Sequence, residues 1–390
     1  MQQIALAWLV YRLTDSVWLL GVVGFSTQIP VFVLAPFAGV IADRHHRHRL
    51  LLLTQTAAML QAVILAVLVV TNTITVWQII ALGLFMGLIN AFDIPVRQSF
   101  TADLVSDDHA DLGNAIALNS SMVNAARLIG PSIGGILIAT AGESVCFILN
   151  ALSYVGVLGS LLAMRIPQRE LPGRKNPWHE LKEGVHYTFS FMPIRTILML
   201  LSFVSLIGWG SQILMPVFAR DILHGGAQML GFLMGSVGLG ATAGAMYLAS
   251  RKSVLGLGRI IVVACFLYGL GMIGFALVPV FWVSMVMLML AGFGMIVHMA
   301  ASNTILQSMV QEDKRGRVMS FYTMAFTGVV PLGNLMAGSL AHDFGAPVVY
   351  MAGGLCIIAS GVLFASQLPR LRELVRPLYI EKGILSEIVH

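Results

Sequence analysis

The sequence predicts an all-α membrane protein, on the strength of three observations. Hydrophobic residues make up 57% of the 390 residues and charged residues only 11%, whereas a soluble domain carries about 25% charged residues. Apolar runs of about 20 residues, the length of a membrane-spanning helix, recur almost from end to end. These runs are continuous and lack the alternating polarity over about ten residues that a membrane β-strand shows. The charged residues lie between the runs.

Eleven predicted spans follow one another along the chain. They cover residues 16–41, 50–71, 75–100, 112–139, 144–165, 194–220, 226–250, 259–279, 281–306, 318–341 and 346–367. Residues 1–13 are apolar through Val10 and are then interrupted by Arg12, and this piece is too short to cross a bilayer. We expect it to be the second half of a helix whose beginning is missing. Counting it gives twelve spans in two sets of six.

The basic residues test this layout. All but three of the 23 Lys and Arg residues lie on one side of it, the exceptions being Arg12, Arg127 and Arg220. By the positive-inside rule the rich side is cytoplasmic. Both termini are then cytoplasmic, in a plasma membrane such as the bacterial inner membrane, which requires an even number of spans. The positive net charge therefore reflects topology, and we expect a lipid bilayer as partner and no nucleic acid.

One long polar connection divides the chain into two halves of similar length. A faint internal repeat agrees with this division, because ADLVSDDHADLGNAIAL after the fourth span is similar to QSMVQEDKRGRVMSF after the tenth. Repeated halves are a recurring transporter architecture. The predicted parts are an N-terminal helix bundle over 1–165, a cytoplasmic linker over 166–193, a C-terminal bundle over 194–367 and a cytoplasmic tail over 368–390.

The connection between the second and third spans carries a recognisable motif, GVIADRHHRHR. It resembles the signature loop of the major facilitator superfamily, in which a glycine, three residues, an aspartate and several bases follow one another. The glycine lets a neighbouring helix approach closely, and the aspartate can face the positive N-terminus of another helix. We expect a cytoplasmic gate here, with a plain basic anchor loop as the alternative; His46 stands where the family usually has glycine. The matching residues are Gly39, Asp43, Arg44, Arg47 and Arg49.

The fifth span carries a second motif, Gly130-Pro131-Ser-Ile-Gly134-Gly135. This GPxxGG element is similar to one associated with exporters of the superfamily. Pro131 removes a backbone hydrogen bond and bends a helix, and the glycines provide a flat face. Ordinary packing of small residues between helices is the alternative.

Charged residues inside predicted spans are costly unless they face a cavity or a partner. Asp93 and Arg97 share one face of the fourth span at a spacing of i, i+4, so Asp93 is either a proton-binding group or a permanently ionised partner near the gate. Arg127 near the middle of the fifth span, together with Asn124, is either a substrate contact in a central cavity or part of a structural ion pair. The depths of Asp93 and Arg127 differ by about 12 Å at 1.5 Å per residue, so we expect two independent sites.

Three further polar residues at membrane depth are candidate cavity residues, although each is also explained by helix-to-helix hydrogen bonds. They are Gln28, Gln212 and His298. The cysteines Cys146, Cys265 and Cys356 lie in or beside apolar runs without metal-ligand spacing, and we expect packing roles for them. We expect no cofactor and no metal. The sequence contains no HExxH, GxSxG or GxxxxGK[ST] pattern, which argues against an enzyme and against ATP as energy source.

The segments AFDIPVRQSF, PVFARDILHGGAQMLGFLMG and EDKRGRVMSF narrow the resemblance. They are similar to the branch of enterobactin-exporter-like secretion transporters in the major facilitator superfamily. This resemblance implies two six-helix bundles, export of small amphipathic molecules such as siderophores or drugs, proton antiport and a monomeric protein. A solute importer or facilitator of the same fold, or an inactive membrane scaffold, are the alternatives.

Overall fold

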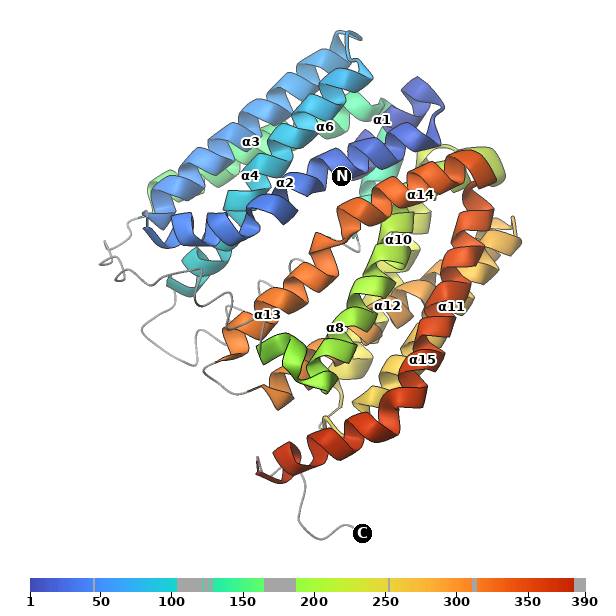
Figure 1. Cartoon of the computed structure of the whole chain (residues 1–390). Coiled ribbons are helices and arrows are strands. Elements are labelled where there is room, and N and C mark those ends of the chain that lie inside the picture. Colours follow the sequence, from blue (N-terminus) through green and yellow to red (C-terminus); the bar gives the residue numbers. More distant parts are fainter. Residues whose placement is uncertain are drawn as a thin grey trace. The chain divides into compact units, whose positions relative to one another are not determined.

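The structure is a computed structural model that describes residues 1–44, 46–103, 122, 126, 129–164, 187–251, 253–310 and 314–381. Within these ranges the chain forms helices joined by short turns and contains no strand (Figure 1). Ten of the described helices are long and apolar enough to cross a membrane by their length and composition, and Ile129–Ala141 is a shorter apolar helix. The prediction of an all-α membrane protein is confirmed. The number of twelve spans stays a prediction.

The helices of the first half begin and end close to the predicted spans. Figure 1 shows α2, α3, α4 and α6 lying side by side. Their faces that meet other helices carry small and apolar side chains, while exposed leucines, valines and isoleucines cover the outer faces, as expected for a protein in lipid. The bounds are α1 Gln2–Thr14, α2 Val17–Arg44, α3 Arg47–Val70, α4 Val76–Asp103, Ile129–Ala141 and α6 Glu143–Ala163.

The helices of the second half are interrupted by π-helical and 3₁₀-helical turns. The first helix of this half is α8 Met192–Val204, and it is followed by η1 Ser205–Trp209, η2 Gly210–Leu214, α9 Met215–Val217 and η3 Phe218–Ile222. The next are α10 Ala227–Ala249, α11 Leu257–Leu277, α12 Phe281–Met309, α13 Arg315–Thr323, η5 Met324–Gly328, α14 Val330–Phe344 and α15 Ala346–Glu381. The elements η1, η3 and η5 are π-helical turns, which are frequent at functional sites.

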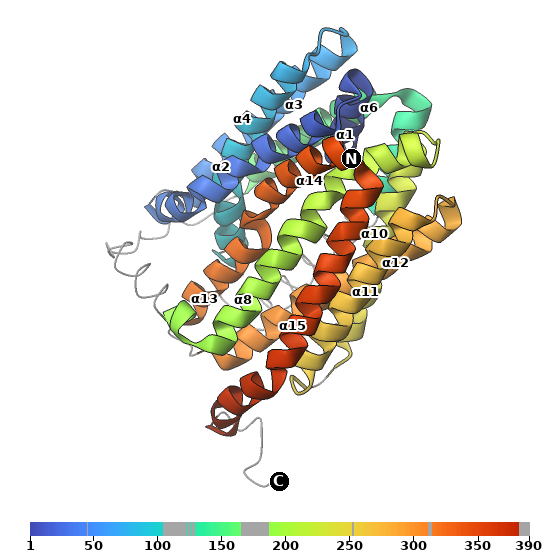
Figure 2. The ribbon, with the colours of Figure 1, turned by 45° about the vertical axis from the view of Figure 1, so that its right-hand side comes forward.

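The last helix extends beyond its predicted span. It continues from residue 367 to Glu381 and holds Pro369 and Pro377 within it. Figure 2 shows α15 bending toward its C-terminal end, which is the expected effect of proline inside a helix.

By the density of their contacts the residues group into two compact units. Unit 1 consists of Met1–Lys175, Gln212–Gly235 and Asn334–Ala346, and unit 2 of Asn176–Ser211, Ser236–Gly333 and Pro347–His390. Unit 1 thus contains the first half of the chain together with three helix ends of the second half. We call the end of unit 1 that holds the turns at 15–16, 71–75, 142, 223–226 and 345 the base-poor end. The predicted division of the chain at 166–193 stays a prediction.

Candidate transport site

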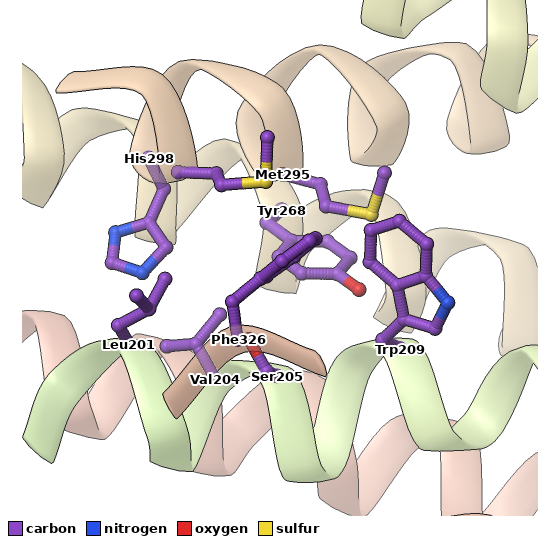
Figure 3. A pocket seen from close by; sticks show the side chains of 9 residues that line it. Leu201, Val204, Ser205, Trp209, Tyr268, Met295, His298 and Phe326 are labelled. Atoms are coloured by element: carbon purple, nitrogen blue, oxygen red, sulfur yellow. The ribbon is translucent and has the colours of Figure 1, made fainter. Parts of the chain in front are cut away.

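Unit 2 contains a small cavity between four helical segments, with room for about one water molecule. Figure 3 shows side chains from these segments directed into it. Its lining is apolar and aromatic apart from three polar side chains. The lining residues are Leu201, Val204, Ser205, Trp209, Tyr268, Met295, His298, Met299 and Phe326.

Two polar atoms at this cavity have no hydrogen-bond partner. Tyr268 is 4% exposed and His298 is 2% exposed, and neither the Tyr268 hydroxyl nor His298 Nε2 makes a hydrogen bond. The other imidazole nitrogen of His298, Nδ1, lies 3.8 Å from Cys265 Sγ. Ser302, one turn further along α12, also has a buried hydroxyl without a partner. Buried polar groups are nearly always hydrogen-bonded, so these atoms mark a place where a water or a ligand group fits.

Close helix packing explains how these residues come together. Met295, His298 and Ser302 share one face of α12, since residues three and four apart lie above one another on a helix. At Gly294 a Cβ would lie 2.5 Å from Ala264 O and 2.6 Å from Tyr268 N, so α11 approaches α12 closely. A Cβ at Gly208 would overlap the Tyr268 phenol. Glycine in the π-helical turn η1 therefore leaves the space that the Tyr268 ring occupies.

Aromatic rings form one wall of the cavity. The Trp209 and Phe326 rings pack edge to face with centroids 4.8 Å apart, and Tyr322 stacks on Phe326 at 6.5 Å. Met295 and Met299 add flexible, polarisable side chains. An apolar pocket with a few convergent polar groups is the usual form of a small-molecule site. The lining thus combines aromatic and apolar surface with unpartnered hydrogen-bonding atoms.

A second polar cluster lies in unit 1 around Asp93, which is 2% exposed. The Asp93 Oδ1 atom accepts hydrogen bonds from Thr54 Oγ1 at 2.9 Å and from Gln55 Nε2 at 2.6 Å. Its Oδ2 atom is ion-paired with Arg97 one turn along α4. Gln55 and Arg97 donate to the carboxylate, and the Thr54 hydroxyl also lies 3.0 Å from Leu51 O. The choice between the two predicted roles of Asp93 stays a prediction.

The base-poor end joins the first half of the chain to segments of the second half. Asp15 forms an ion pair with Arg220, and the Tyr11 hydroxyl donates a hydrogen bond to Asp221. The Arg220 guanidinium also lies 5.5 Å from the centroid of the Tyr11 ring, a cation–π distance. We call these four residues the outer cluster. All of them belong to unit 1.

Glycine pairs hold helices together beside the outer cluster. A Cβ at Gly135 would lie 2.7 Å from the Cα of Gly231 in α10, and a Cβ at Gly338 in α14 would lie 2.7 Å from the Cα of Gly21 in α2. Gly134 of the same motif faces the backbone of Met1, whereas nothing lies within 4 Å of a Cβ at Gly130. The GPxxGG motif therefore provides a helix crossing at Gly135, and its role as a helix bend at Pro131 stays a prediction.

Comparison with known families agrees with this architecture. Residues 1–378 match the family model described as transmembrane secretion effector. The chain belongs to this family of major facilitator transporters.

Relatives of this transmembrane secretion effector cover nearly its whole length. The Staphyloferrin A transporter of Staphylococcus aureus (strain NCTC 8325 / PS 47) is 25% identical over 363 residues, covering 93% of this chain and 90% of the relative. The Multidrug efflux pump Tap of Mycolicibacterium fortuitum is 23% identical over 379 residues, covering 95% and 92%. The Enterobactin exporter EntS of Salmonella typhimurium is 25% identical over 365 residues, covering 93% and 87%.

Solved structures share the fold of this transmembrane secretion effector. A POT family transporter in complex with a thioalcohol-conjugated peptide has a TM-score of 0.74 at 12% identity and covers 95% of this chain and 93% of its own. The nucleoside transporter NupG has a TM-score of 0.68 at 13% identity and covers 94% and 96%. The protein is thus a multi-pass membrane transporter with the major facilitator fold.

The predicted site residues of this transmembrane secretion effector fall in different places. His298 lies at the cavity of unit 2, whereas Gln28 and Gln212 belong to unit 1 and are half-buried. Asn124 and Arg127 lie outside the described residues, so their roles stay predictions. The sequence analysis missed Tyr268, although it is the one tyrosine in the apolar run of α11 and could have been noticed on that ground.

The predicted gate motif is largely helical. The helix α2 continues to Arg44, and α3 begins at Arg47, so the turn is shorter than the predicted loop between residues 41 and 50. The side chains of Gly39, Asp43 and Arg44 lie outside the described part of the chain. Arg47 is half-buried and Arg49 is exposed. The gate role of all five residues stays a prediction.

A neighbouring histidine, which the sequence analysis did not single out, fixes the start of α3. His48 Nε2 lies 2.8 Å from Leu161 O at the end of α6, and its ring stacks on Phe100 with centroids 6.1 Å apart. This contact ties α3 to α4 and α6 beside the motif.

Proposed function

We propose that the protein is a proton-coupled exporter of small amphipathic molecules of siderophore or drug type, acting as a monomer by alternating access. Three of its relatives carry names of siderophore transporters or of a drug efflux pump. The observation that carries the proposal is the cavity of unit 2, where aromatic and methionine side chains surround two unpartnered polar atoms. Such a lining suits molecules that combine a ring with a hydrogen-bonding group.

The proposed cycle uses the two ends of the helices in turn. Positive residues favour the cytoplasm, so we assign the base-poor end to the outer face of the plasma membrane and both termini to the cytoplasm. The outer cluster and the glycine crossings then keep the outer face closed while substrate enters from the cytoplasm. They separate for release, while the motif from Gly39 to Arg49 closes the inner face.

The energy comes from a gradient, because the sequence has no phosphate-binding GxxxxGK[ST] loop. We propose exchange of outward-moving substrate for inward-moving protons, and no catalytic activity.

Inside-out membrane vesicles test this function with ethidium, an aromatic cation, and with iron-free enterobactin as probes. An acidic lumen should drive at least one probe into the vesicles, and collapsing the pH difference should release it. Trp209→Ala should reduce this uptake, whereas the matched variant Trp282→Ala should not, since Trp282 is 72% exposed on the outer face of α12. Uptake that ignores the pH difference would identify a facilitator, uptake only by right-side-out vesicles an importer, and no movement of either probe would argue against export.

A further inference from the structure

The proposed exporter needs a group inside the membrane that gains and loses a proton during each cycle. The sequence predicts that Asp93 is either this proton-binding group or a permanently ionised partner near the gate. The described residues include three buried candidates, Asp93 and Glu143 in unit 1 and His298 in unit 2. Glu143 is ion-paired with Arg12 at the base-poor end, and the surroundings of the other two differ in kind.

Asp93 already has a partner at each of its two oxygens. Its two oxygens already receive donors from Thr54, Gln55 and Arg97. A protonated carboxyl needs an acceptor for its O–H. The Gln55 amide nitrogen and the Arg97 guanidinium only donate, so Thr54 Oγ1, which can donate to Leu51 O, is the one acceptor among these three partners. Protonation would also break the ion pair and leave unsatisfied donors in the interior, which is unfavourable.

His298 has the opposite surroundings. Its Nε2 atom borders the cavity without a partner, and its Nδ1 atom faces only the thiol of Cys265. A neutral imidazole carries one lone pair that accepts a proton or a hydrogen bond. The titratable groups around it are Cys265 and Tyr268, both from α11, while α8, η1 and η5 contribute only uncharged side chains to the cavity.

From this geometry we propose that His298 is the acceptor of the coupling proton, and that substrate and proton compete for its Nε2 atom. The proposal rests on the proposed exporter function. A hydronium ion from the outer face transfers its proton to the Nε2 lone pair, giving an imidazolium and a water, and the proton returns to water on the cytoplasmic side. An imidazolium needs water or a counter-charge, and no carboxylate lies among the lining residues. Water entering the open cavity supplies this stabilisation, so charging is tied to opening.

Tyr268 is a positioning residue in this scheme. Its free hydroxyl borders the same cavity and can hold the water that delivers the proton. A substrate group that enters the cavity displaces this water and donates a hydrogen bond to His298 Nε2. Loading of substrate and loading of the proton thereby exclude one another, which is the requirement for antiport.

Proton release on ligand binding tests the proposal directly. Ethidium added to the purified, weakly buffered protein should release up to one proton per molecule bound. Its apparent affinity should rise by about tenfold per pH unit over the acidic range in which His298 is protonated before binding. His298→Gln and His298→Asn keep a polar amide and should abolish both effects while retaining slower downhill exchange of ethidium. His342→Gln, on the exposed face of α14, is the matched control and should behave like the wild type.

The outcomes distinguish the assignment of His298 from the proposed exporter function. Gradient-driven uptake and proton release that persist in His298→Gln would overturn the assignment and leave the exporter function standing. A wild-type protein that exchanges ethidium but ignores the pH difference would overturn proton coupling itself. Asp93→Asn tests the assignment even if the His298 variants do not fold. This variant should transport more slowly, but ethidium binding to it should still release a proton. Loss of proton release in Asp93→Asn would move the assignment to that residue.

Discussion

At the scale of single residues, the polar groups buried in the helices are of two kinds. Asp93, Thr54 and Gln55 satisfy one another within unit 1. Tyr268 and His298 leave donor and acceptor capacity unused within unit 2. The first arrangement stabilises a fixed structure, and the second keeps room for a ligand that comes and goes. This contrast gives opposite expectations for conservative substitutions at the two places.

Tyr268→Phe removes a hydroxyl that makes no hydrogen bond in the structure. We expect its free energy of unfolding to stay within about 0.5 kcal/mol of the wild type, since no partner is left unsatisfied, while gradient-driven uptake falls. Thermal unfolding in detergent and vesicle uptake measure the two effects. A clear loss of stability would show that the hydroxyl has a partner in the folded protein, such as an ordered water.

Arg97→Met leaves the buried carboxylate of Asp93 without its ion-pair partner. We expect a loss of about 1–3 kcal/mol in stability, because a buried charge then lacks compensation; the exposure of the Arg97 side chain, 61%, keeps the loss below that of a fully buried pair. Adding Asp93→Asn to this variant should recover part of the loss. A double-mutant cycle on thermal unfolding measures the coupling, and strictly additive losses would contradict the pairing.

The two residue-scale features differ in how far the sequence predicts them. The pair of Asp93 and Arg97 follows from helical spacing alone, since residues four apart share a face. The site of Tyr268 and His298 depends on where α11 meets α12 and on the absence of a side chain at Gly208. Such proximity across helices leaves no periodic signal in the sequence. His298 could therefore be flagged as a polar residue at depth, but its surroundings could not be predicted.

At the scale of elements, helix crossings at glycine pairs join the two halves of the chain within unit 1. Gly135→Ala places a methyl group 2.7 Å from the Cα of Gly231, so the two helices must move apart. We expect lower thermal stability and greater labelling of a cysteine introduced at Ser16 by an impermeant maleimide from the outer face. Gly130→Ala is the control in the same motif, because its Cβ meets nothing within 4 Å. Equal labelling of both variants would contradict the role of this crossing.

The ion pair of Asp15 and Arg220 also joins the two halves. Asp15→Arg or Arg220→Asp alone should weaken closure of the outer face and reduce uptake in the vesicle assay, and combining both should restore much of it. The matched control is the pair of Arg12 and Glu143, 2.9 Å apart, which lies wholly within the first half. Exchanging these two residues for one another should change the stability of the protein without changing maleimide labelling of a cysteine introduced at Ser16. Failure of the combined Asp15 and Arg220 variant to recover would show that the pair does not act as a unit.

Helix positions were predictable at this scale, and helix irregularities were not. Apolar runs and charge placement predict α3, α6, α10 and α12 to within a few residues, because both follow from the thickness of the bilayer. The π-helical turns lie beside close contacts, for example where Gly210 meets Gly333. Packing between distant segments produces these turns, so local sequence does not indicate them.

At the scale of the whole molecule, the compact units do not follow the order of the chain. Unit 1 takes in the ends of three helices from the second half, and these ends carry Arg220, Asp221, Gly231 and Gly338. The fold class and the superfamily were predicted by resemblance, and the family comparison confirms them. The grouping into units was not predictable, because it depends on contacts between segments that are distant in the sequence.

The outer cluster has a consequence for the speed of the transporter. Asp15 is 70% exposed and Arg220 is 39% exposed, so dissolved ions reach this pair, and attraction between exposed charges fades beyond about 8 Å at an ionic strength of 0.15 M. The ionic strength of the external solution, more than the bilayer, then determines how long the outer face stays closed. Transport should therefore fall as the external sodium chloride concentration rises, and Asp15→Asn should transport at a rate that does not depend on this concentration.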